Sequence, residues 1–163
     1  MTDDANHETH QQAGRQTPTD TGGDADSGKP THPVRTAQRD EAVRFAADAA
    51  RAMADARCTD IVALDLAGRS PVAECLVIGT GTSDRQMRSV ADDLAELGEA
   101  SEHPALRHTS DDRSTWIVVD FGTVVAHIFE PNTRAHYDLE LLWGDAAPIP
   151  WEREADRRRS HAP

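Results

Sequence analysis

The fold is decided by residues 74–98, which read ECLVIGTGTSDRQMRSVADDLAELG. The first six residues form a short apolar run ended by glycine, which is the pattern of a buried strand. A helix is expected after Ser83, because Ser83 can cap it and Gln86 completes a capping box. Gly98 is expected to end this helix. The apolar stripe between them consists of Met87, Val90, Ala91, Leu94 and Leu97. A buried strand that leads directly into an amphipathic helix indicates an α/β domain.

Helical and strand patterns continue on both sides of this stretch. Upstream, apolar residues at helical spacing predict a helix, and a β-branched run closed by Gly68 predicts a strand. The predicted elements outside residues 74–98 are a helix over 40–57, strands over 60–66, 104–108, 116–120 and 123–129, and a last helix from 131 or 132 to 143. In this last helix an apolar stripe on one face is formed by Ala135, Leu139, Leu142 and Trp143. The predicted order is αββαβββα. The fold class is therefore α/β, with a single mixed β-sheet and flanking helices.

Composition divides the chain into three parts. Residues 1–39 contain too few large apolar side chains to offset the entropy cost of folding, and we expect a disordered N-terminal tail there. Residues 40–150 hold most of the apolar residues and are expected to form one folded domain of a common size. From Trp151 the chain becomes rich in charge, so 151–163 are expected to be a charged, disordered C-terminal tail.

The predicted domain is strongly acidic. Residues 40–150 carry 20 acidic and nine basic side chains, which gives −11 of the chain's net charge of −12. Such a domain is repelled by nucleic-acid phosphates and by anionic membrane surfaces, so we expect neither direct nucleic-acid readout nor membrane binding. If the domain acts near RNA, it should bind a basic protein there. Solubility alone is an alternative explanation of the acidity.

The chain is expected to be cytoplasmic. Its first ten residues, MTDDANHETH, have neither the basic nor the apolar region of a secretory signal peptide. No apolar run in the sequence approaches the roughly 20 residues that span a bilayer. Cys58 and Cys75 form no CxxC pair and are expected to be free, buried thiols.

The loop Gly79–Ser83 lies between a predicted strand and a predicted helix, where phosphate-binding loops are found. Asp84 stands at the third glycine position of GxGxxG, where its charge opposes a pyrophosphate, and the lysine of a P-loop is missing. A nucleotide-binding protein or nucleotidyltransferase-type enzyme that uses this loop remains the alternative function. His127 is expected to be a hydrogen-bonded residue of a half-buried face. No catalytic residue, cofactor or metal ligand set is expected.

Two aromatic residues suggest a binding surface. Trp116 opens a predicted strand after a polar stretch, and Phe121 lies at the tip of the predicted hairpin, where polar residues are usual. Large apolar side chains displayed at such edges are typical binding anchors. The alternative is that both side chains fold back into the core.

Four motifs in order give the chain a family resemblance. They are residues 61–66, residues 79–83, Asp120-Phe121-Gly122 with His127, and the segment 137–145, which reads YDLELLWGD. Together they strongly resemble the ribosomal silencing factor family, also called the Iojap family. The resemblance covers roughly residues 40–148 and neither tail.

The resemblance implies a nucleotidyltransferase-like fold that has lost catalysis. It implies a translational repressor that binds the large ribosomal subunit through its fourteenth protein and prevents the small subunit from joining when nutrients are scarce. Organellar relatives act in assembly of the large subunit. The implied contacts to the ribosomal protein are Trp116 and Phe121, with Asp120 and Tyr137 at recurrent positions nearby. A dimeric scaffold is a third interpretation of the sequence.

Overall fold

The computed structural model describes residues 33–66 and 68–160. The chain divides into two compact units, Met1–Pro30 and Thr31–Pro163, and all described residues belong to the second. Most of the expected N-terminal tail therefore lies outside the described residues. Residues 33–39 do not follow that expectation, because they form the first two turns of a helix.

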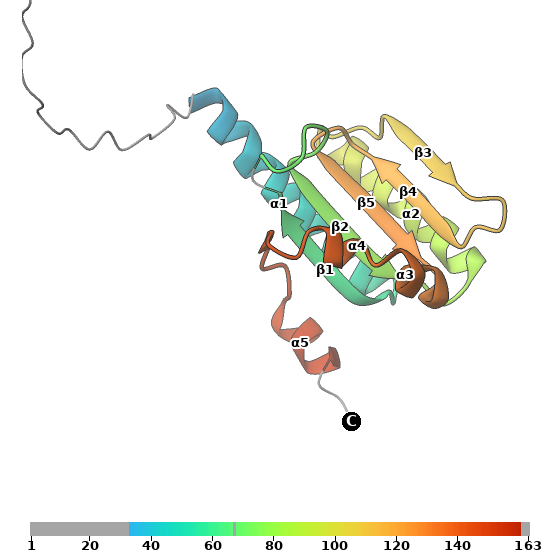
Figure 1. The fold of residues 1–163 in the computed structure, drawn as a ribbon. Coiled ribbons are helices and arrows are strands. Elements are labelled where there is room, and N and C mark those ends of the chain that lie inside the picture. The colour runs from blue at the N-terminus through green and yellow to red at the C-terminus, as the bar shows by residue number, and fades with distance from the viewer. Residues whose placement is uncertain (1–32, 67, 161–163) are drawn as a thin grey trace, which may run out of the picture. The chain divides into compact units, whose positions relative to one another are not determined.

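The described residues form a single mixed sheet with helices on both faces, which confirms the predicted fold class (Figure 1). The elements in chain order are α1 (Pro33–Asp55), β1 (Thr59–Asp65), β2 (Cys75–Thr80), α2 (Asp84–Ala100), β3 (Arg107–Ser110), β4 (Trp116–Asp120), β5 (Val124–Phe129), α3 (Pro131–Tyr137), α4 (Leu139–Leu142), β6 (Ala147–Pro148) and α5 (Glu154–Ser160).

The strands follow the spatial order β3-β4-β5-β2-β1-β6. β2 and β5 run parallel, from the pair Cys75 and Val124 to the pair Thr80 and Phe129. The other neighbouring strands are antiparallel. All six residues of β2 are buried, as expected for a strand with neighbours on both edges and layers on both faces.

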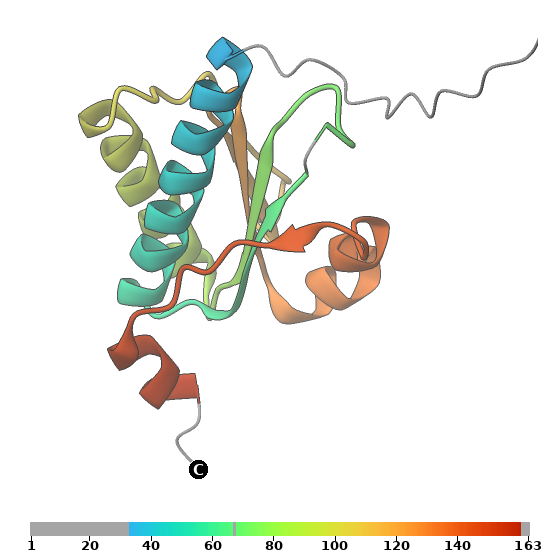
Figure 2. The ribbon, with the colours of Figure 1, turned by 90° about the vertical axis from the view of Figure 1, so that its left-hand side faces the viewer.

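The two faces of the sheet carry different layers. Figure 2 shows the sheet nearly edge-on, with the long helices α1 and α2 on one side and the short helices α3 and α4 on the other. Alternate strand residues point to opposite faces, so Val77 packs toward α1 and α2 whereas Ile78 packs toward α3 and α4. The smaller layer is α3 and α4, with seven and four residues, compared with 23 and 17 in α1 and α2.

The Ser83 cap of α2 forms as predicted, but the helix ends at Ala100 and not at Gly98. The Ser83 hydroxyl accepts a hydrogen bond from the Gln86 amide at 3.2 Å. The Gln86 side chain returns to the Thr82 amide at 2.7 Å, one residue before the cap, and its Nε2 donates to the Ala56 carbonyl oxygen at the end of α1. The cap therefore joins the two long helices as well as starting α2.

The predicted last helix is broken in two. Asp138 adopts a left-handed conformation with φ of 42° and ψ of 57°, which ends α3 and starts α4. The expected buried stripe is also wrong at Leu142, which is exposed. The strand expected over 104–108 lies over 107–110 instead, and β6 was not predicted.

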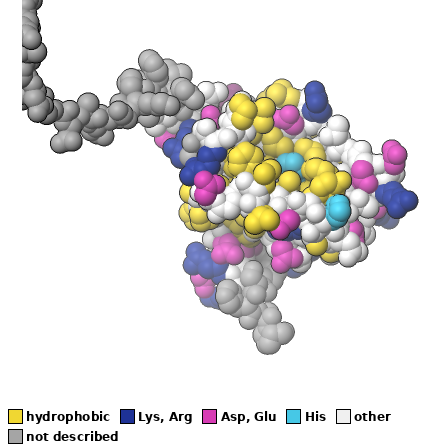
Figure 3. Space-filling view, viewed as in Figure 1, with side chains coloured by type: hydrophobic (Ala, Val, Ile, Leu, Met, Phe, Trp, Pro, Cys, Tyr) yellow, Lys and Arg dark blue, Asp and Glu magenta, His cyan; other side chains and the backbone are white. Residues whose placement is uncertain are grey.

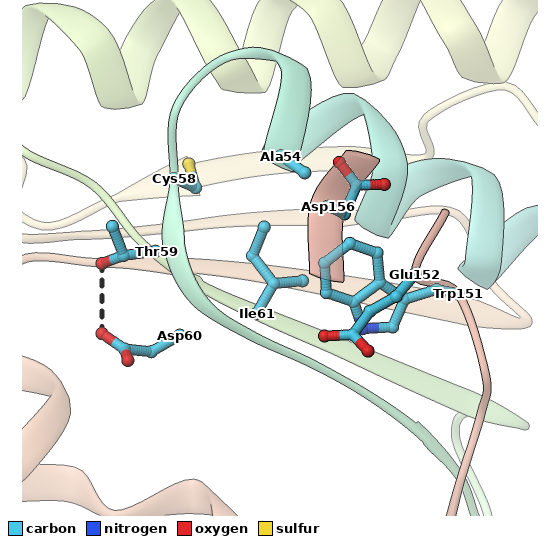
Figure 4. Close-up of a pocket in the computed structure, with 8 residues that line it drawn as sticks. All are labelled: Ala54, Cys58, Thr59, Asp60, Ile61, Trp151, Glu152 and Asp156. Atoms are coloured by element: carbon cyan, nitrogen blue, oxygen red, sulfur yellow. Dashed lines mark hydrogen bonds between the residues drawn. The ribbon is translucent and has the colours of Figure 1, made fainter. Parts of the chain in front are cut away.

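The folded part does not end at Pro150. Trp151 is 8% exposed and belongs to the main core, and α5 follows it. The expectation of a disordered tail from Trp151 is corrected because specific bonds hold this segment against α1: Arg153 pairs with Asp55, and with the buried Asp156 of α5. Figure 4 shows Trp151 and Glu152 beside Ile61, at a shallow pocket near the start of β1.

Candidate binding surface

Four aromatic rings gather on the face of the sheet that carries α3 and α4. Trp116 of β4 stacks on Phe129 of β5, with ring centroids 4.9 Å apart. Tyr137, the last residue of α3, lies 4.7 Å from Trp116 by the same measure. His127 lies 5.8 Å from Trp116 and 6.0 Å from Phe129. We call these four residues the aromatic face.

Strand pairing and a polar turn position Trp116. Trp116 is the register partner of Phe129, so the two rings lie directly across the β4–β5 ladder. In the turn before β4, the Asp111 carboxylate accepts hydrogen bonds from the Trp116 amide and the Thr115 hydroxyl, both at 2.9 Å. Desolvation opposes ionisation of Asp111, but hydrogen bonds led by that from the Trp116 amide hold its pKa below the ordinary value. Asp111 thus fixes the start of β4.

His127 holds the indole of Trp116. Trp116 Nε1 donates a hydrogen bond to His127 Nδ1 at 3.1 Å. Burial lowers the pKa of His127 to about 4, so the ring is neutral at physiological pH. The expectation that His127 is a hydrogen-bonded residue of a half-buried face is confirmed.

Exposed apolar side chains continue this surface. Tyr137 is 52% exposed, and Leu141 and Leu142 of α4 are 77% and 69% exposed. Figure 3 shows hydrophobic side chains gathered around a histidine on the side of the molecule that carries α3 and α4. Partly buried neighbours of the same layer are Val62, Val125, Leu139 and Trp143. Contiguous exposed apolar surface of this kind marks sites of protein contact.

A partly buried arginine fixes the corner between α3 and α4. Arg134 donates to the hydroxyl of Thr80 at the end of β2, with 2.6 Å between the atoms. Its Nε donates to Glu140 of α4 at 2.8 Å, and its terminal nitrogen forms an ion pair with the same carboxylate. These bonds hold the chain on both sides of Tyr137 against the sheet, so the position of Tyr137 is set by the fold.

The structure separates Phe121 from Trp116. Phe121 is 6% exposed and packs on the α1 and α2 side, edge to face with Phe45, with ring centroids 4.9 Å apart. The expectation of an outward Phe121 is wrong, because Gly98 of α2 has no side chain and leaves room for the ring. Asp120 accepts a hydrogen bond from the Gly122 amide at 2.8 Å and shapes the turn. Trp116 and Tyr137 are thus brought together, whereas Asp120 and Phe121 lie at the other end of β4.

The Gly79–Ser83 loop directs its polar groups to its own chain. The Gly81 amide donates to the Phe129 carbonyl oxygen at 2.8 Å, and the Thr82 amide to Gln86. A Cβ added at Gly81 would lie 2.2 Å from Cγ of Met87, so this glycine serves close packing. Asp84 forms an ion pair with Arg88 at 2.8 Å. Two of the loop amides, those of Gly81 and Thr82, are therefore occupied by protein acceptors.

Among the described residues, the thiols and acidic groups form no second site. Cys58 and Cys75 are free and buried, as expected, and burial raises the pKa of Cys58 to about 11 and that of Cys75 to about 12. Neither thiol is therefore ionised at neutral pH. In the described part of the chain, no three His, Cys, Asp or Glu side chains are placed to hold a metal ion. None of its helices has the length and apolar character needed to cross a membrane.

The sequence did not single out the leucines of α4 as surface residues. Helical spacing predicts Leu142 on the apolar face of the last helix and gives Leu141 no role. The adjacent pair indicates that at least one of the two leucines lies at the surface, because neighbouring residues of a helix point to different faces.

The fold and this surface define a class of small mixed α/β proteins with two long helices on one sheet face and, on the other, a thinner layer that carries exposed apolar side chains. Residues 39–163 match the model of the family described as "Ribosomal silencing factor during starvation". The chain belongs to this family of ribosome-associated regulators of translation.

Relatives and solved structures agree with this assignment. A ribosomal silencing factor of Bacillus subtilis is 39% identical over 98 residues, which cover 60% of this chain and 83% of the relative. A mouse protein named "Mitochondrial assembly of ribosomal large subunit protein 1" is 31% identical over 87 residues, covering 52% of this chain and 38% of that protein. A crystal structure from Chromobacterium violaceum has a TM-score of 0.57 at 27% identity, covering 63% of this chain and 83% of that one.

Proposed function

We propose that this protein binds the large ribosomal subunit through the subunit's fourteenth protein and blocks joining of the small subunit. It thereby represses translation in the cytoplasm when nutrients are limiting. Family membership supports a ribosome-associated silencing role. The mouse relative is named for assembly of the large ribosomal subunit, which supports the choice of subunit.

The observation that carries the proposal is the partly exposed Trp116 and the exposed Tyr137 of the aromatic face, on a strongly acidic domain. Tyrosine and tryptophan are common among residues that dominate protein–protein binding energy. The charge of −11 over residues 40–150 repels ribosomal RNA and favours a basic ribosomal protein as the partner. In this proposal Trp116 and Tyr137 touch the partner, whereas Asp120 and Phe121 maintain the shape of the hairpin.

The proposed block is steric and uses no catalytic residue. A domain seated at the face where the subunits join excludes the small subunit by its volume alone. The occupied amides of the Gly79–Ser83 loop and the un-ionised thiols are consistent with a binding protein.

Co-sedimentation with purified large ribosomal subunits tests the docking step. Trp116→Ala is expected to weaken binding about tenfold or more, as loss of a binding anchor does. Leu106→Ala is the matched control, because Leu106 is 71% exposed and lies before β3, away from the aromatic face. If both variants bind as tightly as the parent protein, the aromatic face does not contact the ribosomal subunit.

A joining assay tests the second step. Purified large and small subunits are mixed with the protein, and the fraction of joined ribosomes is measured by sucrose-gradient sedimentation. The protein is expected to lower that fraction, and Trp116→Ala is expected to lose the effect. Size-exclusion chromatography over a range of concentrations would reveal whether the same face instead pairs two copies of the chain.

A further inference from the structure

The hydrogen bond between Trp116 and His127 fixes where the His127 ring carries its proton. The indole nitrogen of tryptophan can only donate, so His127 Nδ1 must be the acceptor in the 3.1 Å bond. A neutral imidazole has one N–H group. The proton of His127 therefore lies on Nε2, and that nitrogen is a hydrogen-bond donor.

The Nε2 atom of His127 has no hydrogen-bond partner among the described residues. Within the described residues, the hydrogen bond of this side chain is the one to Trp116. No buried side-chain nitrogen or oxygen there is without a partner. Since Nε2 has no partner in that part of the chain, it is not fully sealed, and the partly buried ring keeps this edge at the surface.

This donor is surrounded by apolar side chains. The register partners of His127 on the neighbouring strands are Val118 of β4 and Ile78 of β2. Trp116, Phe129 and Tyr137 complete the surroundings on the aromatic face. When docking removes water from a polar hydrogen, that hydrogen needs a new acceptor. Without one, the binding free energy is weakened by the cost of desolvating the N–H group.

We propose that His127 Nε2–H donates a hydrogen bond to an uncharged acceptor oxygen of the docked ribosomal protein, while Nδ1 orients Trp116. This inference rests on the proposed function and adds the chemistry of its contact. An uncharged acceptor such as a main-chain carbonyl fits best, because removing a carboxylate from water costs far more. The rest of this surface binds by burying apolar side chains, which does not fix an orientation. The hydrogen bond of His127 is directional and therefore fixes how the partner is oriented on the surface.

Two substitutions separate the roles of the two ring nitrogens. In His127→Asn, the amide oxygen lies near the position of Nδ1, so Trp116 keeps an acceptor and the outer donor is lost. In His127→Gln, the longer amide places an N–H group near the position of Nε2, so the outer donor is restored. His108→Asn is the matched control, because His108 is exposed on β3 and pairs with Val119, whose side chain faces α1 and α2.

Binding to purified large ribosomal subunits is measured by co-sedimentation for all three variants. His127→Asn is expected to bind about tenfold more weakly, which corresponds to loss of one hydrogen bond. His127→Gln is expected to recover most of that loss, and His108→Asn to bind as the parent does. If His127→Asn binds normally and His127→Gln does not, His127 acts only by holding Trp116 and the inference is overturned. If the parent protein itself does not bind, the proposed function fails instead.

A measurement on the unsubstituted protein keeps the inference testable if a variant fails to fold. Long-range ¹H–¹⁵N spectra of the histidine rings at neutral pH distinguish a proton on Nε2 from one on Nδ1. The Nε2–H form is expected for His127, and its Nε2 resonance should shift on addition of the purified fourteenth protein. A proton on Nδ1, or an unchanged Nε2 resonance in the bound protein, would overturn the inference.

Discussion

Arg51 Nε donates a hydrogen bond to the main-chain carbonyl oxygen of Trp151 at 2.9 Å, across 100 residues of sequence. Arg51 belongs to α1, and Trp151 lies beyond the last strand of the sheet. The bond holds the extended segment after β6 against the longest helix, so that the indole of Trp151 can enter the core. The C-terminal segment is thus part of the core on the α1 side of the sheet.

Trp151→Ala is expected to lower the free energy of unfolding by about 3–5 kcal/mol, the usual cost of removing a large aromatic ring from a core. Urea denaturation followed by circular dichroism measures the change. Arg158→Ala is the control, because its side chain is largely exposed in α5. If both variants unfold at the same urea concentration, the segment after Pro150 does not contribute to the core in solution.

Gly98→Ala is expected to destabilise the protein although alanine favours helices. The added Cβ would lie 2.4 Å from the His103 carbonyl oxygen and 2.7 Å from Cε1 of Phe121, and the main chain cannot move aside easily. We expect a loss of about 1–3 kcal/mol, as for other overpacked cores. Gly144→Ala is the comparison, because its nearest contact would be an ordinary 3.5 Å. Equal thermal stability of the two variants would mean that Phe121 is not packed against Gly98.

Asp138→Val is expected to lower the free energy of unfolding by about 1–2 kcal/mol, because a β-branched residue is strained in the left-handed conformation. Asp138→Gly should be neutral or stabilising, since glycine adopts this conformation without strain. Ala135→Val in α3 controls for the poorer helix propensity of valine. Thermal denaturation of the three variants gives their order of stability. If Asp138→Val is as stable as Ala135→Val, residue 138 is not in the left-handed conformation.

Stability should fall as the solution is acidified through the titration of His127. Its folded pKa of about 4 lies below the ordinary 6.5, so protons bind the unfolded chain first. The stabilisation is therefore complete above about pH 6.5 and is lost as the pH falls toward 4, by an amount on the order of 3 kcal/mol. Urea denaturation between pH 7 and 4 measures it, and His127→Asn should show a shallower decline. Parallel declines in the two proteins would contradict the assignment.

Local patterns predicted the centre of the fold well. The apolar run of β2, the Ser83 cap and the stripe of α2 each depend on residues close in sequence, and all formed as expected. The mixed sheet followed from the order of these elements. The position of Trp116 at the start of β4 was likewise a local prediction.

The parts that were missed depend on distant residues. Phe121 turns inward because Gly98, on another element, leaves space for it. The α3–α4 corner lies where it does because Arg134 bonds to Thr80, 54 positions away. Trp151 is buried because Arg51 holds its main chain. Periodicity reports which face of an element is apolar, but it does not report which other elements will meet that face.

The parallel pairing of β2 with β5 has a consequence for biogenesis. β1 and β2 are translated early, but β2 obtains its second neighbour only when Val124–Phe129 emerges after α2, β3 and β4. Until then an apolar strand exposes an unpaired edge, which is the feature that lets chains aggregate. Pairing of strands that lie far apart in the sequence, such as β2 and β5, is a slow step of folding. If synthesis stops before Val124, the resulting fragment is expected to be prone to aggregation. A regulator of translation thus depends on its own translation continuing through β5.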